Sequence, residues 1–273
     1  MAIHPQAIVD PQAKIAASAE VGPFAVIEGP VKIGEHAKIY PNTYISGWTE
    51  IGDRCEIHPN AIVGHLPQDF HFEGGRSYCR IGAGTIIREG ASIHRGTQAE
   101  STTVVGKDCF ILGNAHVGHN CEVGDDVKIY NCAVLSGHVT VGDHAIISGY
   151  VLVHQFCRIG EYVMVGGGAR LTKDVPPYMK ALHESTCVGY NVLGLQRSGE
   201  FTSEETGEIR TAFRMMFRTR APFLRALDEF ATQVRTRTGR RIVDFCKSES
   251  KLGIIGGRRA NAVLRDAAEN DYA

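Results

Sequence analysis

The 273-residue sequence lacks long apolar runs and carries almost no net charge. No stretch approaches the roughly 20 apolar residues of a membrane span, and the N-terminus has no basic segment leading into an apolar one. The formal net charge of −1 gives no bias toward nucleic acid or membrane surfaces. We therefore expect a cytoplasmic protein with no membrane span and no nucleic-acid partner.

The chain also lacks the short secreted scaffold that disulfides usually stabilise, although it contains eight cysteines. Four of them occupy the small position of a repeat described below: Cys55, Cys109, Cys121 and Cys157. We predict that most of the cysteines are reduced and lie in the core of a cytosolic protein.

Helical periodicity is missing before residue 175, and a six-residue repeat stands in its place. From Ile3 to Leu171 one register contains 29 positions, and all except Asp69, Gly75 and Ala99 are large aliphatics. Small or β-branched residues recur four positions after these aliphatics. A period of six fits neither an amphipathic helix nor a simple alternating strand, but it fits a short strand followed by a tight corner.

Three hexads make a coil of 18 residues, so the repeat predicts nearly ten coils stacked about 4.8 Å apart. The pattern resembles that of hexapeptide-repeat proteins. A conventional parallel sheet would need helical crossovers, which this stretch does not supply. We predict an all-β solenoid, a left-handed parallel β-helix of hexapeptide repeats, over residues 1–178. A C-terminal α-helical domain is predicted over residues 179–273.

Two segments interrupt the repeat. Residues 64–80 and 98–104 are polar, glycine-rich or aromatic, and we predict that they form loops leaving the prism. Loops on a rigid scaffold are common places for binding residues.

The C-terminal part begins after two prolines that end the register. Ser203 has the form of a helix N-terminus, Pro222 starts a second helix, and a third runs from about residue 238 to 247. We expect these helices to cap the prism, and the tail beyond Gly256 to be loosely ordered. Between Arg197 and Arg265, 15 Lys and Arg face 8 Asp and Glu. This excess predicts either a basic surface for an acidic partner or merely solvated helix faces.

Histidines gather in the middle of the repeat. Hexads three apart share a face, so the hexads beginning at residues 117, 135 and 153 place His119, His138 and His154 on one face. His116 is placed at the corner leading onto that face. If the loops leave the register unchanged, hexads 63, 81 and 99 share this face and both loops lie beside it. Six further histidines are interpreted as structural or surface residues: His4, His36, His58, His94, His144 and His183.

Histidine chemistry leaves three functions open. A neutral imidazole can take the proton from a hydroxyl that attacks an activated acyl group, if an oxyanion donor lies nearby. Three histidines can instead hold zinc between subunits, in a hydratase similar to gamma-class carbonic anhydrases. The third hypothesis is a non-catalytic assembly scaffold with idle histidines.

Several motifs resemble the UDP-N-acetylglucosamine O-acyltransferase family, and the similarity is collinear from about residue 1 to 220. The motifs are residues 93–97 (IHRGT), 114–119 (NAHVGH), 136–138 (SGH), 153–157 (VHQFC), 163–167 (VMVGG) and 174–178 (DVPPY). The resemblance implies transfer of a 3-hydroxyacyl chain from acyl carrier protein to the 3-hydroxyl of UDP-N-acetylglucosamine, in lipid A synthesis. It also implies a homotrimer with sites between subunits and no cofactor or metal. Because the repeat starts at Ile3, we expect no room for the N-terminal uridine-binding domain of the related N-acyltransferase.

The resemblance implies a role for individual residues. His119 matches the general base, the backbone N–H of Gly137 matches the oxyanion donor, and Asp69 matches the carboxylate that holds the sugar hydroxyls. The other matches are substrate-binding residues and residues that limit the acyl-chain length. The substrate-binding matches are His71, His116, His138, His154, Gln155, Asn191 and Arg197; the chain-length matches are Gly167 and Met164.

Four positions depart from the family pattern. Asn120 stands where an aspartate assists the base, and His71 replaces a lysine. Leu193 and Ser198 replace a glutamate and an arginine near the nucleotide, which predicts weaker or differently arranged contacts there. A 3-amino UDP-sugar is therefore an alternative acceptor, because an amine depends less on a strong base than a hydroxyl does.

Overall fold

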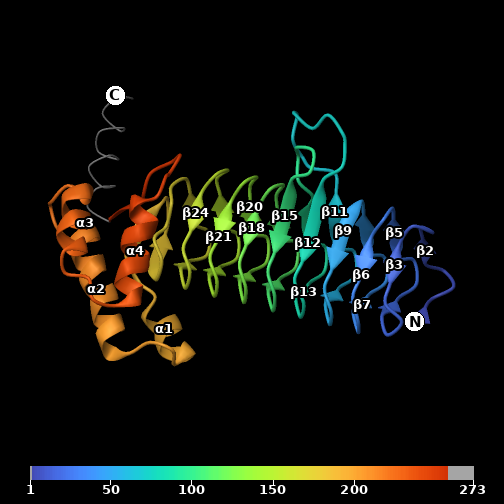
Figure 1. The fold of residues 1–273 in the computed structure, drawn as a ribbon, viewed down its shortest axis with the longest axis horizontal. Coiled ribbons are helices and arrows are strands. Elements are labelled where there is room, and N and C mark those ends of the chain that lie inside the picture. The colour runs from blue at the N-terminus through green and yellow to red at the C-terminus, as the bar shows by residue number, and fades with distance from the viewer. Residues whose placement is uncertain (1, 258–273) are drawn as a thin grey trace.

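The computed structural model describes residues 2–257, in which a long prism of strands ends in a group of helices (Figure 1). The N-terminus lies at the far end of the prism from the helices (Figure 1). A loosely ordered tail was expected beyond Gly256. Gly257 instead pairs in a short strand, and residues 258–273 lie outside the described part of the chain. No helix in residues 2–257 is long and apolar enough to cross a membrane.

Three sheets form the faces of the prism over residues 2–257, and we call them sheets A, B and C. Sheet A contains β1 (Ala2–Ile3), β4 (Glu20–Val21), β7 (Lys38–Ile39), β10 (Glu56–Ile57), β13 (Ile86–Ile87), β16 (Phe110–Ile111), β19 (Lys128–Ile129), β22 (Ile146–Ile147), β25 (Met164–Val165), β27 (Met179–Leu182), β28 (Thr186–Tyr190) and β29 (Gly256–Gly257). Sheet B contains β2 (Ile8–Val9), β5 (Val26–Glu28), β8 (Tyr44–Ser46), β11 (Ile62–His65), β14 (Ser92–His94), β17 (His116–Val117), β20 (Val134–Leu135), β23 (Leu152–Val153) and β26 (Arg170–Leu171). Sheet C contains β3 (Lys14–Ile15), β6 (Lys32–Ile33), β9 (Trp48–Ile51), β12 (Tyr78–Ile81), β15 (Thr102–Val105), β18 (Glu122–Val123), β21 (Thr140–Val141) and β24 (Arg158–Ile159).

The hexad explains why most strands are two residues long. Its aliphatic residue points inward and the preceding residue outward, so Val117 is fully buried while His116 is only half-buried. The small residue, such as Ala115, fills the corner and is also fully buried. Corner residues such as Asn114 adopt a left-handed backbone, with φ of 57°, which asparagine tolerates better than most residues. The predicted left-handed parallel β-helix is confirmed.

The cysteines are free thiols, as predicted, and most belong to this core. Buried in the structure are Cys55, Cys79, Cys109, Cys121, Cys157 and Cys187. Cys132 and Cys246 are half-buried.

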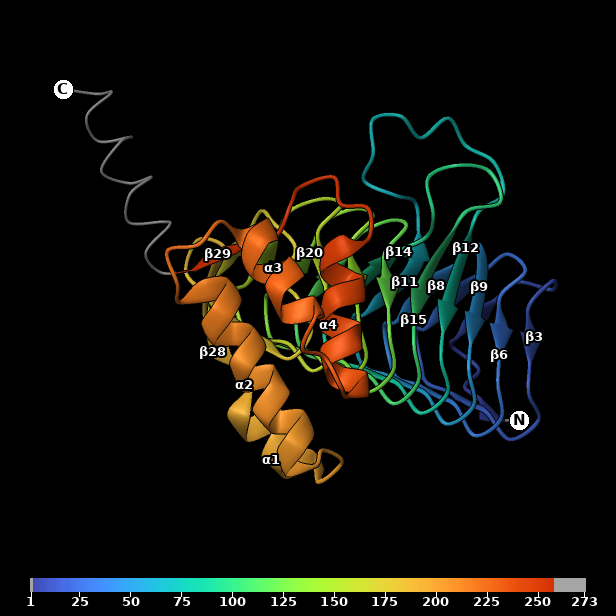
Figure 2. The ribbon, with the colours of Figure 1, turned by 60° about the vertical axis from the view of Figure 1, so that its left-hand side comes forward.

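Two loops leave the prism where sheet B passes into sheet C, and both project to the same side (Figures 1 and 2). The first joins β11 to β12 and the second joins β14 to β15. The first spans residues 66–77 and is shorter than the predicted 64–80, because strand residues occupy both ends of that segment. The second spans residues 95–101, three residues before the predicted 98–104, because β15 begins at Thr102.

The assumption that the loops leave the register unchanged is wrong. Val63 pairs with Ile93, 30 residues later, and Ile93 pairs with Val117, 24 residues later, whereas an undisturbed coil takes 18. Ile81 accordingly lies in sheet C beside Ile51 and not on the face of Val117. The extra residues in these two coils together equal one 18-residue coil, so Val63 and Val117 again lie in the same sheet, sheet B. Both loops still leave from one corner.

The C-terminal part extends sheet A and then turns helical. β27 and β28 form an antiparallel hairpin on the last coil, and four helices follow within the described residues. They are α1 (Val192–Ser198), α2 (Ser203–Phe217), α3 (Phe223–Ala231) and α4 (Arg237–Lys247). The predicted helix starts at Ser203 and Pro222 are confirmed within one residue, whereas α1 was not predicted.

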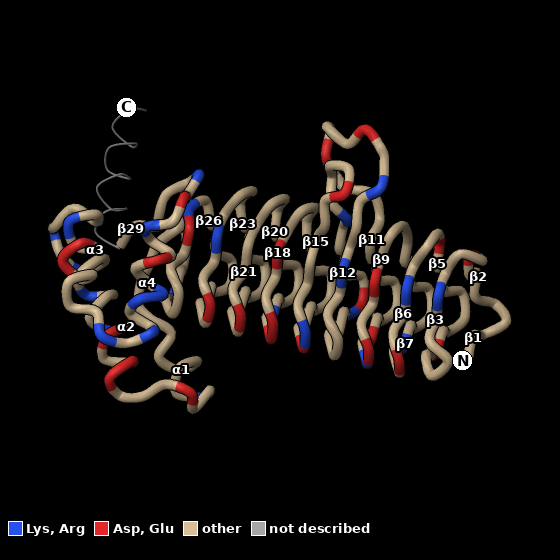
Figure 3. Tube along the Cα trace, in the orientation of Figure 1, with Lys and Arg blue, Asp and Glu red and all other residues tan. Residues whose placement is uncertain are grey.

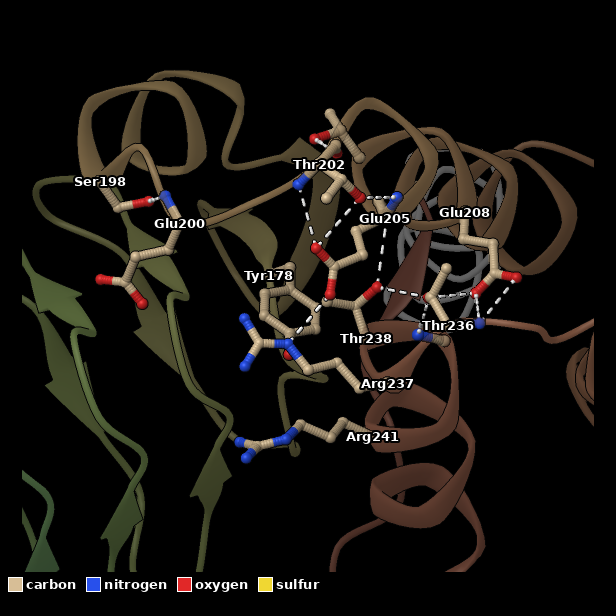
Figure 4. A network of polar contacts seen from close by, with 12 residues as sticks. Tyr178, Ser198, Glu200, Thr202, Glu205, Glu208, Thr236, Arg237, Thr238 and Arg241 are labelled. Atoms are coloured by element: carbon tan, nitrogen blue, oxygen red, sulfur yellow. Dashed lines mark hydrogen bonds and ion pairs between the residues drawn. The ribbon is translucent and has the colours of Figure 1, made fainter.

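A polar network joins the helices to the end of the prism (Figure 4). Thr202 and Glu205 form a capping box at the start of α2, and Glu205 also pairs with Arg237 of α4 at 2.9 Å. Arg241 of α4 pairs with Glu161, which also accepts the Tyr178 hydroxyl hydrogen. The helices are therefore held on the prism by side chains that come from both.

Candidate active site

Successive coils stack their corner residues where sheet B passes into sheet C. The His138 N–H donates to the His119 carbonyl at 2.9 Å, and the Phe156 N–H donates to the Gly137 carbonyl at 3.2 Å. Gly137 and Gln155 occupy the same coil position as His119, one and two coils further on. The predicted grouping of the histidines on one side of the prism holds, but their shared element is this corner and not a flat face.

His119 is held between two side chains, and its own side chain is only 9% exposed. Nδ1 lies 3.0 Å from Asn120 Oδ1, and Nε2 lies 3.7 Å from Asp69 Oδ2. Because Asn120 Oδ1 also accepts the Thr97 N–H at 3.0 Å, it is an acceptor, and Nδ1 must carry the proton. In the neutral form of the ring, the Nε2 lone pair faces Asp69 and can accept a proton.

Asp69 reaches this corner from the first loop. Its Oδ1 accepts the His71 N–H at 3.0 Å, and this backbone bond is the main reason that the pKa of Asp69 is lowered. The carboxylate is thus ionised at neutral pH and offers Oδ2 on the His119 side. The His71 side chain is 92% exposed, so its contribution in one chain is to fix Asp69.

His138 lies between His119 and an aromatic ring. It meets His119 edge-on, with ring centroids 5.3 Å apart, and stacks on Phe156 at 4.9 Å. Burial is the main cause that lowers the pKa of His138, followed by the charges of His119 and Lys251. His138 is therefore a neutral hydrogen-bonding group at neutral pH.

His116 was predicted at a corner, and this prediction is wrong: His116 lies on strand β17. Its Nδ1 lies 2.8 Å from Ser92 Oγ, and its ring meets His94 edge-on at 4.9 Å. Burial lowers the pKa of His116. The hexad places its strand residues just before and at the aliphatic position, which is why the residue before Val117 is in a strand.

His94 was interpreted as structural or surface, and the structure places it in the wall of this site. It is 5% exposed, and burial lowers its pKa to about 4. Its Nδ1 accepts the Gln68 N–H at 3.3 Å, next to Asp69 in the first loop. The motif at residues 93–97 could have indicated that His94 belongs to the site. Only the corrected register, however, puts this motif beside His116.

Gly137 is the position where a side chain would destroy the arrangement. A Cβ there would lie 2.5 Å from His119 Nε2. At another corner the equivalent N–H, that of Asp125, is occupied by Asp143 Oδ1 at 2.8 Å. Within residues 2–257 no acceptor pairs with the Gly137 N–H. A free N–H donor therefore lies beside His119 Nε2, in a position from which it could donate to an oxyanion.

Other predicted site residues lie elsewhere in the chain. His154 is exposed one coil further along the same corner, with Nδ1 2.9 Å from the Gln155 carbonyl. Asn191 caps α1 through the Gly194 N–H and donates to the Tyr162 carbonyl, at the corner between sheets C and A.

The remaining predicted residues lie at the other two corners or on another sheet. Arg197 lies in the last turn of α1, the helix that Asn191 caps. Met164 is in β25 of sheet A, and Gly167 is exposed at the corner after it. Leu193 and Ser198, the departures, are also in α1. One chain therefore does not bring these residues to His119.

Metal binding was the alternative use of the histidines. In residues 2–257, no three His, Cys, Asp or Glu side chains form a group that could hold a metal ion.

Known proteins resemble the chain over nearly its whole length. The family described as "Udp N-acetylglucosamine O-acyltransferase; Domain 2" matches residues 174–255, "Bacterial transferase hexapeptide (six repeats)" matches residues 30–65, and "GMPPB C-terminal domain" matches residues 93–192. A Syntrophobacter fumaroxidans protein named acyl-(acyl-carrier-protein)–UDP-N-acetylglucosamine O-acyltransferase is 38% identical, over 93% of this chain and 100% of its own length. A protein of that name from Aliivibrio fischeri is 45% identical, over 79% of this chain and 83% of its own. The solved UDP-N-acetylglucosamine acyltransferase of Francisella novicida has a TM-score of 0.89 at 35% identity, over 95% of this chain and 96% of that one.

Proposed function

Because this chain belongs to the family of acyl-(acyl-carrier-protein)–UDP-N-acetylglucosamine O-acyltransferases, we propose that it performs the first step of lipid A synthesis with His119 as general base. The reaction moves a 3-hydroxyacyl chain from acyl carrier protein to the 3-hydroxyl of UDP-N-acetylglucosamine. Asp69 is assigned to the sugar hydroxyls.

The chemistry needs one proton acceptor and one oxyanion donor. His119 Nε2 takes the proton of the sugar 3-hydroxyl as its oxygen attacks the thioester carbonyl. The Gly137 N–H donates to the oxyanion of the tetrahedral intermediate. When the intermediate collapses, the carbon–sulfur bond breaks and the imidazolium returns its proton to the thiolate.

The observation that carries this proposal is the fixed tautomer of His119. Asn120 accepts from Nδ1, so the Nε2 lone pair points toward Asp69. The proposal puts the acceptor hydroxyl between these two side chains. A neutral amide orients the ring but does not stabilise the imidazolium as a carboxylate would. The residue at position 120 therefore affects how strongly the imidazolium is stabilised in the transition state.

The complete site is proposed to lie between subunits of a cytoplasmic homotrimer. His119 and Asp69 share one corner of the prism, while Asn191 and Arg197 lie at another. A neighbouring copy that presents its α1 would bring these residues to the nucleotide, where a guanidinium can pair with phosphate oxygens.

The acyl carrier protein is proposed to dock near the helical end. Lys and Arg are frequent on the helices, whereas Asp and Glu recur along one edge of the prism (Figure 3). Acyl carrier proteins are acidic, so basic helices would raise the rate of encounter.

The test is incubation with UDP-N-acetylglucosamine and a ladder of 3-hydroxyacyl carrier proteins, with products identified by mass spectrometry. We expect the O-acylated sugar, and a loss of at least about 100-fold in kcat/KM for His119→Ala. His58→Ala, which removes a largely buried histidine after β10, is the matched control and should keep its activity.

Three results would overturn the proposal. Product only from the 3-amino analogue of the UDP-sugar would assign the alternative acceptor. Stoichiometric zinc with hydratase activity lost to a chelator would assign the hydratase. An active His119→Ala variant would show that another group is the base.

A further inference from the structure

Lys251 brings a cation to the corner that carries His119. It follows α4, in a segment that returns to the last coils of the prism. Its Nζ lies 4.0 Å from the centroid of the Phe156 ring, which stacks on His138. Because His138 meets His119 edge-on, a continuous column of side chains runs from His119 to Lys251, one coil at a time.

A buried ion pair fixes the position of this segment. Asp174 is fully buried, and its Oδ2 lies 2.7 Å from Arg158 Nε and accepts from Ser250 Oγ at 2.7 Å. Arg158 Nη1 also donates to Ser248 Oγ at 2.6 Å. Backbone bonds link Asp174 to Gly253 and Ile255. The residues on both sides of Lys251 are thus anchored to the prism.

Within residues 2–257, the Lys251 ammonium has the π face of Phe156 as its neighbour and no carboxylate as an ion-pair partner. The side chain is exposed, and among the ion pairs of residues 2–257 none includes it. A ring face occupies one side of the ammonium and leaves N–H donors for another acceptor. Its charge contributes to the lowered pKa of His138, and the Asp69 charge acts on the same imidazole in the opposite sense. Lys251 therefore lies within electrostatic reach of the site.

We propose that Lys251 binds the diphosphate of the nucleotide sugar. This inference rests on the proposed function, which places the sugar 3-hydroxyl at His119. A pyranose ring is about as wide as one coil spacing of ~4.8 Å, so a sugar at His119 and His138 directs its diphosphate toward Phe156 and Lys251.

Calorimetric binding of UDP-N-acetylglucosamine to the full-length protein tests the proposal without requiring turnover. Lys251→Met keeps the aliphatic stem on Phe156 and removes the charge. We expect it to raise Kd, and KM for the nucleotide sugar, by roughly fivefold, as for an exposed ion pair. Lys251→Arg should restore binding, and Lys251→Glu should weaken it further. Lys32→Met, an exposed lysine paired with Glu50 in the N-terminal half, is the matched control and should bind normally.

The outcomes separate this inference from the proposed function. If the wild type transfers acyl chains and Lys251→Met binds the nucleotide sugar normally, the inference about Lys251 is overturned and the proposed function stands. A raised KM for the acyl carrier protein with an unchanged KM for the sugar would assign Lys251 to the phosphodiester of the carrier and also overturn it. If the wild type binds the nucleotide sugar but transfers no acyl chain, the proposed function fails while the binding comparison still decides the role of Lys251.

Discussion

Asn120 shows how one residue orients an imidazole without adding charge. Its Oδ1 accepts from both His119 Nδ1 and the Thr97 N–H, and its left-handed backbone, with φ of 59°, suits asparagine and aspartate. An aspartate would keep both hydrogen bonds and would add a negative charge next to the imidazole. A comparison of asparagine and aspartate at position 120 therefore separates the orientation of the His119 ring from the effect of a negative charge beside it.

Asn120→Asp is expected to raise kcat/KM for acyl transfer at neutral pH by about tenfold. A carboxylate that accepts from Nδ1 stabilises the imidazolium formed in the transition state, and about 1.4 kcal/mol of such stabilisation is tenfold in rate. Rates measured with saturating acyl carrier protein check this. An unchanged kcat/KM would mean that the residue at position 120 does not act on His119.

His94 is a second residue whose neighbours determine its properties. It is buried beside His116, and burial lowers its pKa from 6.5 to about 4. The unfolded chain therefore binds a proton below pH 6.5, whereas the folded chain stays neutral at this position down to about pH 4. Protonation of this group in the unfolded chain therefore lowers the free energy of unfolding as the pH falls from 6.5 toward 4, and has little effect above pH 6.5.

His94→Gln keeps an acceptor for the first loop and removes the titration. Relative to this variant, the wild type should lose about 3 kcal/mol more of its free energy of unfolding between pH 7 and pH 4. Urea unfolding at pH 7, 5.5 and 4 measures the difference. Parallel pH profiles for both proteins would contradict the assignment.

At the scale of elements, the loops and helices place groups that the prism alone cannot. The first loop delivers Asp69 to His119, and the segment after α4 delivers Lys251 to Phe156. Both are held by buried partners, His94 for the loop and Asp174 for the segment. The helices depend in turn on their caps, because the first N–H groups of a helix lack partners within it.

Thr202→Ala should lower the free energy of unfolding by about 1 kcal/mol, because the capping box of α2 is lost. Thr211→Ala is the matched control: Thr211 is exposed within α2, and its hydroxyl only bonds the Gly207 carbonyl. The control should change stability by less than about 0.5 kcal/mol. Denaturant unfolding followed by far-UV circular dichroism measures both, and equal losses would argue against the capping role.

At the scale of the whole molecule, the proposed site needs two chains. His119 and Arg197 lie at different corners of one prism, and in the proposed homotrimer neighbouring copies would bring them together. Each interface would then combine His119 of one copy with Arg197 of its neighbour.

Mixing two inactive variants tests this arrangement. His119→Ala and Arg197→Ala, co-expressed in equal amounts, should recover about a quarter of the wild-type activity, because random assembly pairs the two intact residues at about one interface in four. Each variant alone is the control and should stay inactive. No recovery in verified mixed trimers would mean that both residues act within one chain.

Much of the fold was predictable because the hexad is a local rule repeated many times. The aliphatic at every sixth position determines which side chains are buried, and this pattern requires a prism of short strands. The starts of α2 and α3 were predictable from Ser203 and Pro222, which carry local signals. The seven-residue α1 was missed, since its apolar pattern is too short to stand out.

The sequence by itself determined the prism, its buried residues and the resemblance that names His119, because these follow from short-range spacing. Only the tertiary structure decided the phase of the loops, the burial of His94, and the meetings of Asp69 with His119 and of Lys251 with Phe156. These contacts join residues 50 and 95 positions apart, and they depend on how loops and helices return to the prism. No local periodicity encodes that path, because packing against distant coils determines it.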